Sequence, residues 1–202
     1  MRLLLTGFEP FGGETVNPSW AVACALAAAP PEGVTLTTLE LPVRGRISFE
    51  RLLPALDSGD YDAWLGLGEA GGRSVLSVER VGINVLIDGR GAEEQALVDG
   101  GPAAYFSRLP VAEVAAAIAR GGVPAQVSNS AGTYICNEVT YVVQHHLASA
   151  GRDLPSGFIH LPFLPEQAAA RPPGTPSMAL ETQVAGVRAA IACLQEIVAA
   201  RA

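Results

Sequence analysis

The sequence predicts a three-layer α/β/α sandwich, in which helices cover both faces of a mostly parallel central sheet. Short apolar segments with strand character alternate with longer segments whose apolar residues recur at helical spacing. Several of the apolar segments run directly into glycine-rich loops, as strands of such sheets do at their carboxyl ends. The chain has 202 residues, 49% of them hydrophobic, which is enough for one buried core, and we expect a single domain spanning residues 1–202.

Strands and helices alternate in the first half of the chain. Asn17 and Pro18 form a good N-cap and first-turn pair for a helix that continues to Ala29. Pro54 lies inside the next helical pattern and weakens it. In order, we expect a strand at 2–6, a Gly/Pro/Phe-rich loop at 7–16, the helix at 18–29, a strand at 34–43, a helix at 48–56 and a strand at 63–67.

The second half of the chain ends in the clearest helix of the sequence. From Pro176 onward, apolar residues recur at helical spacing as far as Val198, and Thr175 is suitably placed to cap this helix. Before it we expect a strand at 76–85, a polar surface loop at 89–101, a helix at 111–119, a strand at 125–128, a helix from about 136 to 147 and a strand at 157–161. The loops that follow the strands at 2–6, 63–67, 125–128 and 157–161 are the expected place for a functional site.

Charge and cysteine usage exclude several classes of partner. The formal net charge is −7 and there is no run of Lys or Arg, which argues against nucleic acid and anionic membranes. The N-terminal apolar run is too short for a signal peptide, and no segment approaches the ~20 apolar residues of a membrane span. Cys24, Cys136 and Cys193 are widely spaced without a C-x-x-C pair, so we expect a reduced, cytoplasmic protein with no metal site.

Cys136 is the most conspicuous of the three cysteines. It follows the polar loop SNSAGTYI and stands near the start of a predicted helix, where Ser128, Asn129, Ser130 and Thr133 could cap free amides. Unpaired N–H groups at a helix start carry partial positive charge, which should lower the pKa of the thiol. The alternative is a buried cysteine that acts as a small hydrophobic residue. We expect that packing role for Cys24 and Cys193, which lie in Ala/Leu-rich helical patterns.

A cysteine nucleophile needs a base, and the chain has three histidines. His145 and His146 follow Cys136 on the same predicted helix by about 14 Å, at ~1.5 Å per residue, so we expect them to be helix-end residues. His160 ends a short apolar strand in GFIHLPF, from which a ring can reach the loop edge that holds Cys136. A satisfied core histidine is the alternative for His160.

Glu79 is the candidate to orient that histidine. In the predicted strand it shares parity with valines, so side-chain alternation points its carboxylate into an apolar environment. A lone buried carboxylate costs several kcal/mol, and an imidazole N–H would satisfy it. The alternative is an ion pair with an arginine such as Arg73 or Arg90.

The two glycine-rich loops, GFEPFGG and GLGEAGGR, lack the spacing of phosphate-binding loops. Phe8 and Phe11 in the first loop are more informative, because two aromatic residues beside a site could wall a flat apolar pocket. Ordinary core packing is an equally good explanation for them.

Taken together, these motifs resemble one family over nearly the whole chain. LLLTGFEPFGGETVNPSW, GEAGGR followed by ERVGIN, GGPAAY, SAGTYICN, GFIHLPFLPEQ and PSMALE occur in the order found in pyroglutamyl peptidase I, or pyrrolidone-carboxylate peptidase. The resemblance implies a cysteine peptidase that removes N-terminal pyroglutamyl residues from peptides without a cofactor. It also implies a homotetramer or dimer.

The resemblance assigns residues as well. Cys136 would be the nucleophile, His160 the general base and Glu79 the residue that orients it. Phe8, Phe11 and Asn17 would hold the pyrrolidone ring, and Arg90 resembles an arginine near the oxyanion region in the family.

The chain departs from the family pattern at two places. Glu69 stands in GEAGGR where family members usually carry Gln, and GRGAEEQALVDG replaces a longer loop. An ionised Glu69 beside the cysteine would raise the pKa of the thiol and oppose an oxyanion. Two alternative functions therefore stay open: a related thiol amidase with shifted acyl specificity, and a catalytically silent binding protein on the same scaffold.

Overall fold

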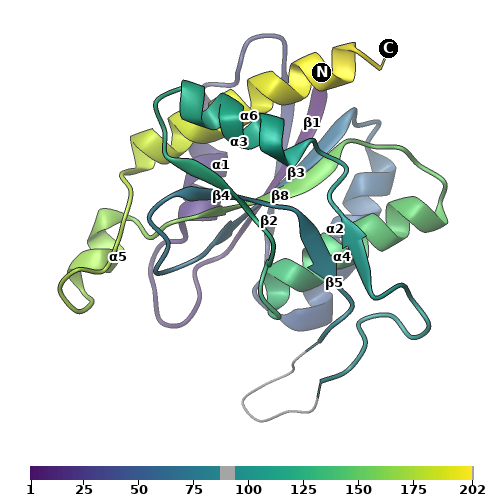
Figure 1. The fold of residues 1–202 in the computed structure, drawn as a ribbon, viewed down its shortest axis with the longest axis horizontal. Helices are drawn as coiled ribbons and strands as arrows, with labels where there is room; N and C mark the ends of the chain where they lie inside the picture. The colour runs from purple at the N-terminus through teal and green to yellow at the C-terminus, as the bar shows by residue number, and fades with distance from the viewer. Residues whose placement is uncertain (87–93, 202) are drawn as a thin grey trace.

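The computed structural model describes residues 1–86 and 94–201, and a mixed six-stranded sheet forms the centre of this part of the chain (Figure 1). The strand order is β2-β1-β3-β8-β4-β7. Neighbouring strands are parallel except β4 and β8, which pair antiparallel. The strands are β1 (Arg2–Phe8), β2 (Thr35–Leu41), β3 (Ala63–Glu69), β4 (Leu76–Glu79), β7 (Ala125–Ser128) and β8 (Ser156–Leu161).

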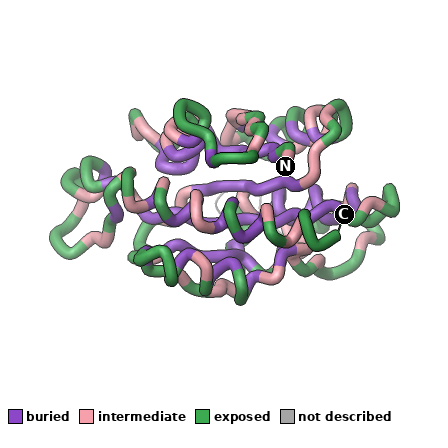
Figure 2. Tube along the Cα trace, turned by 90° about the horizontal axis from the view of Figure 1, so that it is seen from above, coloured by how far each residue is buried: buried purple, intermediate pink, exposed green. Residues whose placement is uncertain are grey.

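Helices cover both faces of this sheet, which confirms the predicted three-layer α/β/α sandwich. One face packs against α1 (Pro18–Ala28), α3 (Val111–Arg120) and α6 (Leu180–Ala199), and the other against α2 (Gly45–Ser58) and α4 (Ile135–Ser149). The short α5 (Pro165–Ala169) follows β8. Figure 2 shows the buried residues concentrated in the middle layer and on the inward sides of the helices.

Alternate residues of each central strand supply the two hydrophobic clusters. In β1, Leu3 and Leu5 join the cluster beneath α1, α3 and α6, whereas Leu4 and Phe8 join the cluster beneath α2 and α4. A central strand that is buried on both faces reads as a continuous apolar run, which is why RLLLTGF lacks polar alternation.

The predicted single strand at 76–85 is wrong, because the chain changes sheets at Arg80. β4 ends at Glu79, and β5 (Val81–Ile83) pairs antiparallel with β6 (Ala104–Phe106) in a separate two-stranded sheet. The exposed Arg80 links the two sheets through its backbone, since its N–H donates to the Ser128 carbonyl and its C=O accepts from the Ser107 N–H. Periodicity cannot reveal such a change, because the residues on both sides remain extended.

The small sheet lies against α4. Asn137 accepts a hydrogen bond from the Ile83 N–H (2.8 Å) and donates to the Ile83 carbonyl (3.0 Å), so its amide replaces a neighbouring strand. Gly82 packs so closely on α4 that a Cβ atom there would lie 2.8 Å from the Tyr141 nitrogen. The same helix therefore carries Cys136 and anchors this sheet.

Two further expectations are corrected at the level of single residues. α6 begins at Leu180 rather than after Thr175, whose hydroxyl donates to the Pro172 carbonyl within a turn. Cys24 is exposed on α1, so it has no packing role there, whereas Cys193 is buried as expected.

The direction of β7 also differs from the expectation. β4 and β7 run opposite to the other four strands of the main sheet, so the loop after Ser128 leaves at a different end from the loops after β1, β3 and β8. Residues 129–134 then connect β7 to the start of α4.

Candidate active site

Cys136 lies in the first turn of α4, where the sequence places it. The N-cap residue is Tyr134, which makes no side-chain cap bond within the described chain. Two of the polar residues before it bond within their own loop instead: Ser128 Oγ donates to the Ser130 carbonyl, and Ser130 Oγ accepts from the Gly132 N–H. Asn129 Oδ1 accepts from Arg80 Nε. The predicted capping by these side chains is therefore wrong. The first amides of α4, which have no acceptor within the helix, remain available beside the thiol.

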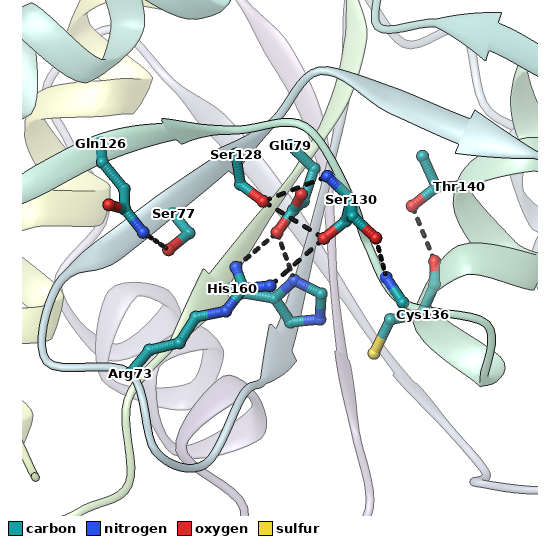
Figure 3. Close-up of polar contacts among 10 residues, drawn as sticks. Arg73, Ser77, Glu79, Gln126, Ser128, Ser130, Cys136, Thr140 and His160 are labelled. Atoms are coloured by element: carbon teal, nitrogen blue, oxygen red, sulfur yellow. Dashed lines mark hydrogen bonds and ion pairs between the residues drawn. The ribbon is translucent and has the colours of Figure 1, made fainter.

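The first turn of α4 places Cys136 against Gly68 of β3. Gly68 of β3 pairs in register with His160 of β8. A Cβ atom on Gly68 would lie 2.9 Å from Cys136 Sγ, so the sulfur occupies the space that this glycine leaves free. In Figure 3 the imidazole of His160 lies between Glu79 and Cys136.

His160 and Glu79 form a diagonal pair across the antiparallel strands β4 and β8. Glu79 is paired in register with Phe158, and His160 with Ser77, so the two side chains lie on one face of the sheet, two residues apart. His160 Nδ1 and Glu79 Oε1 are 2.7 Å apart, and both side chains are buried (Figure 3). The structure thus brings the three predicted catalytic residues together.

Arg73 is a second partner of the same carboxylate. Its Nη1 donates to Glu79 Oε1 at 2.6 Å, so the two alternative partners considered for Glu79, a histidine and an arginine, occur together. Burial raises the pKa of Glu79, but the hydrogen bond of His160, with contributions from Ser128 and Arg73, brings the net pKa below the ordinary value. Glu79 is therefore ionised at neutral pH.

The protonation state of His160 follows from its surroundings. Burial lowers the pKa of His160, and the opposing effect of Glu79 does not restore it, so the ring is neutral at neutral pH. Because an ionised carboxylate can only accept, Nδ1 carries the ring hydrogen and Nε2 keeps a lone pair. A neutral histidine in this tautomer can accept a proton.

The expected depression of the Cys136 pKa is not found. The pKa of the thiol is raised to about 12, first by burial and then by the carboxylates of Glu79 and Glu69. The thiol is therefore protonated at neutral pH, and desolvation outweighs the partial charge of the helix start. A reaction at this sulfur requires a base that removes its proton.

A pocket of about 270 Å³ opens beside the thiol and contains the other described candidates. Its wall includes Phe8, Phe11, Asn17, Glu69, Val43, Tyr134, Ile135 and Cys136. Phe8 is also a core residue, 2% exposed, whose ring lies 6.4 Å from that of Phe158, whereas Phe11 is 38% exposed. Phe8 therefore packs in the core and also forms a wall of the pocket, so both predicted roles apply to it.

Hydrogen bonds fix the side chains of Asn17 and Glu69. Asn17 is the N-cap of α1: its Oδ1 accepts from the Ser19 N–H, and its Nδ2 donates to the Glu9 carbonyl. Glu69 Oε2 accepts from Gln167 Nε2 at 2.7 Å. Burial raises the pKa of Glu69 despite that hydrogen bond. Gln167, a buried residue of the GFIHLPFLPEQ motif, is not among the predicted site residues.

Three other predicted residues lie away from this centre or outside the structure described. Arg90 lies outside the described residues. His146 is paired with Asp57 at 2.8 Å, and His145 Nδ1 lies 3.0 Å from the Tyr105 hydroxyl. As expected, neither histidine joins Cys136.

Within residues 1–86 and 94–201, no group of three or more His, Cys, Asp or Glu side chains is arranged to hold a metal ion. None of the helices in that same part of the chain is long and apolar enough to cross a membrane.

The fold and this arrangement define an α/β protein with a half-buried thiol beside a buried His–Glu pair. Residues 1–197 match the family model described as pyroglutamyl peptidase, and the chain belongs to this family. It is therefore an enzyme of the cysteine-type omega peptidase class.

Relatives and solved structures agree with this assignment. The chain is 46% identical to a pyrrolidone-carboxylate peptidase of Streptomyces coelicolor, covering 95% of this chain and 90% of the relative, and 43% identical to one of Gloeobacter violaceus, covering 96% and 97%. The crystal structure of the pyrrolidone carboxyl peptidase from Fervidobacterium islandicum AW-1 superposes with a TM-score of 0.91 at 41% identity, covering 97% of this chain and 99% of the other.

Proposed function

We propose that this protein removes N-terminal pyroglutamyl residues from peptides, with Cys136 as nucleophile, His160 as general base and Glu79 as the residue that orients the base. One observation carries the proposal: the pocket walled by Phe8 and Phe11 ends at Cys136, beside the His160–Glu79 pair. The names of the relatives supply the acyl group, because pyrrolidone carboxylate is the pyroglutamyl residue.

In the first step His160 Nε2 takes the proton of the Cys136 thiol as the sulfur attacks the pyroglutamyl carbonyl carbon. The neutral state of His160 and the raised pKa of the thiol favour this concerted removal over a resting thiolate. Collapse of the tetrahedral intermediate breaks the C–N bond, and the imidazolium protonates the departing amine. A thioester on Cys136 remains.

Water completes the reaction. His160 takes a proton from the water as its oxygen attacks the thioester, and the C–S bond then breaks to return the thiol and free pyroglutamate. Throughout both steps the ionised Glu79 stabilises the imidazolium and keeps Nδ1 facing it.

The start of α4 is suited to stabilise the oxyanion. Its first amides lie in the same turn as Cys136 and have no acceptor within the helix. Removal of one well-placed oxyanion donor typically costs about 3 kcal/mol in the barrier.

The pocket is matched to a small, flat, uncharged ring. Phe8 and Phe11 offer apolar walls, while Glu69 and Asn17 supply polar groups. A protonated or hydrogen-bonded Glu69 is compatible with a neutral lactam, and burial already favours protonation by raising its pKa.

Comparing acyl groups tests the function. The purified protein under reducing conditions should hydrolyse a fluorogenic pyroglutamyl amide and should leave the matched prolyl and glutaminyl amides intact. Faster cleavage of the prolyl amide would indicate the related amidase with shifted specificity. No cleavage of any of the three would favour the binding protein. Size-exclusion chromatography with light scattering would test the expected homo-oligomer.

A further inference from the structure

One arginine joins the base, its orienting carboxylate and the loop that leads to the nucleophile. Arg73 Nη1 and His160 Nδ1 bond to the same oxygen of Glu79, at 2.6 and 2.7 Å. Arg73 Nη2 donates to the Ser130 carbonyl at 3.2 Å, in the loop before α4 (Figure 3). Ser128 Oγ donates to the same carbonyl, so the hydrogen bond from Arg73 adds to one that already holds this loop.

The turn between β3 and β4 orients the side chain of Arg73. Gly72 has a φ of +86°, a conformation that side chains other than glycine rarely adopt. Arg73 N–H donates to the Ala70 carbonyl and closes the turn. The consecutive glycines of GEAGGR therefore place the guanidinium over Glu79, which gives this motif a role other than phosphate binding.

We propose that Arg73 is a positioning residue that keeps Glu79 ionised and thereby fixes His160 in the tautomer with hydrogen on Nδ1. The proposal rests on the proposed function, in which Nε2 must receive the thiol proton. A guanidinium suits this role because it remains charged and can only donate hydrogen bonds.

The protonated state of Glu79 shows why the positive charge of Arg73 matters. Glu79 is fully buried next to a neutral ring, an environment in which a carboxylate alone would tend to take up a proton. A protonated Glu79 would donate its O–H to Nδ1, and the ring hydrogen would move to Nε2. That tautomer points a donor at Cys136 and cannot accept its proton. Arg73 opposes this switch.

The charged groups around the pair set the sign of the expected pH effect. His160 faces Glu79 of β4 and Arg73 of the β3–β4 turn, and Figure 3 shows Cys136 of α4 on its other side. Glu69 of β3 and Glu138 of α4 add charge near the thiol. Arg73 lowers the pKa of His160 and contributes to the lowered pKa of Glu79. Its loss should raise both values and move the acid limb of kcat/KM to higher pH.

Two substitutions and one control test the proposal. Arg73→Gln removes the charge but keeps a polar side chain, and Arg73→Lys keeps the charge. Arg152→Met is the matched control, because Arg152 Nη1 shares Asp57 Oδ1 with His146 in the same pattern, outside the site. The readouts are kcat and KM for the pyroglutamyl amide, the pH profile of kcat/KM, and the ¹⁵N chemical shifts of His160, which report its tautomer without substrate.

We expect Arg73→Gln to lower kcat about 10²-fold with little change in KM, to shift the acid limb upward, and to increase the Nε2–H tautomer at neutral pH. Arg73→Lys should restore the acid limb and the Nδ1–H tautomer, and Arg152→Met should match the parent in every readout. An Arg73→Gln variant with the parent tautomer and acid limb would overturn the proposal. If that variant fails to fold, a folded Arg73→Lys variant with the Nε2–H tautomer would overturn it.

The two proposals fail in distinguishable ways. A parent protein that does not hydrolyse the pyroglutamyl amide contradicts the proposed function, yet the His160 tautomer in the three variants still decides the role of Arg73.

Discussion

Two clusters in this molecule each combine a carboxylate, a histidine and an arginine, but one is buried and the other is exposed. In one, Glu79 Oε1 accepts from His160 and Arg73; in the other, Asp57 Oδ1 accepts from His146 and Arg152. The carboxylate and imidazole of the first are 0% and 4% exposed, whereas those of the second are 47% and 27% exposed. Contact between an arginine, a carboxylate and a histidine is therefore not sufficient to form a catalytic site.

Burial and a neighbouring thiol account for the difference. In the buried cluster, desolvation lowers the pKa of His160 and keeps the ring neutral, so it can act as a base toward Cys136. Water screens the exposed cluster, which joins α2 to the end of α4 and has a structural role. A substitution in the buried cluster can therefore be compared with the matching substitution in the exposed one.

The largest effect should come from Glu79→Gln. The amide cannot hold the imidazolium as the carboxylate does, and it can accept a ring hydrogen only in one orientation. We expect kcat to fall by roughly 10²–10⁴-fold with KM nearly unchanged. Steady-state kinetics of this variant and of Asp57→Asn would check this; equal losses in both variants would contradict the distinction between the clusters.

A second effect concerns stability in acid. The folded-state pKa of His160 lies below its unfolded value, so the unfolded chain binds the extra proton as the pH falls below about 6.5. The free energy of unfolding should then decrease by up to about 1.4 kcal/mol per pH unit until the folded-state pKa is reached. Urea titrations between pH 7 and pH 5 would measure it, about the range where histidine titrates.

His160→Gln should flatten this dependence, and His146→Gln should leave it in place. An unchanged slope in His160→Gln would mean that other groups cause the loss of stability.

A smaller effect is expected at Glu69. Its carboxylate contributes to the raised pKa of Cys136, so Glu69→Gln should lower that pKa and increase the thiolate fraction at a given pH. The rate of Cys136 alkylation by iodoacetamide near pH 8 should rise roughly two- to fivefold. Mass spectrometry of the Cys136 peptide would follow the reaction, with the exposed Cys24 as internal reference and Glu166→Gln as control. A slower reaction would mean that Glu69 does not raise the pKa of Cys136.

The smallest effect should follow Asp57→Asn. The Asp57 pairs are exposed, and such pairs contribute less than about 1 kcal/mol to the free energy of unfolding. Chemical denaturation should show a change within that limit and kinetics should show none. A loss of several kcal/mol would mean that the exposed cluster is as important for the fold as the buried one.

Much of this architecture could be predicted from the sequence. The strand at 63–67, the Asn17 cap and the helix that begins near Cys136 follow from local patterns, and the structure has all three. The pocket residues Phe8, Phe11, Asn17 and Glu69 were identified by motif and lie beside Cys136.

What could not be predicted depends on non-local contacts. The change of sheet at Arg80 requires partners at Ser128 and Ser107. The predicted burial of Glu79 is confirmed, although its strand ends at Glu79 itself and does not continue to Val85. The pKa of Cys136 was predicted in the wrong direction, because the sequence shows the helix start but not the desolvation of the thiol. Gln167 was missed because its contact with Glu69 spans 98 residues.

Trapping the acyl-enzyme would show whether Cys136 is the nucleophile. A reaction with a pyroglutamyl amide, quenched in acid and digested, should give a pyroglutamyl thioester on the peptide that contains Cys136 and none on those with Cys24 or Cys193. The thioester should disappear as substrate is exhausted. Turnover with another cysteine acylated, or turnover that persists in Cys136→Ala, would rule out Cys136 as the nucleophile.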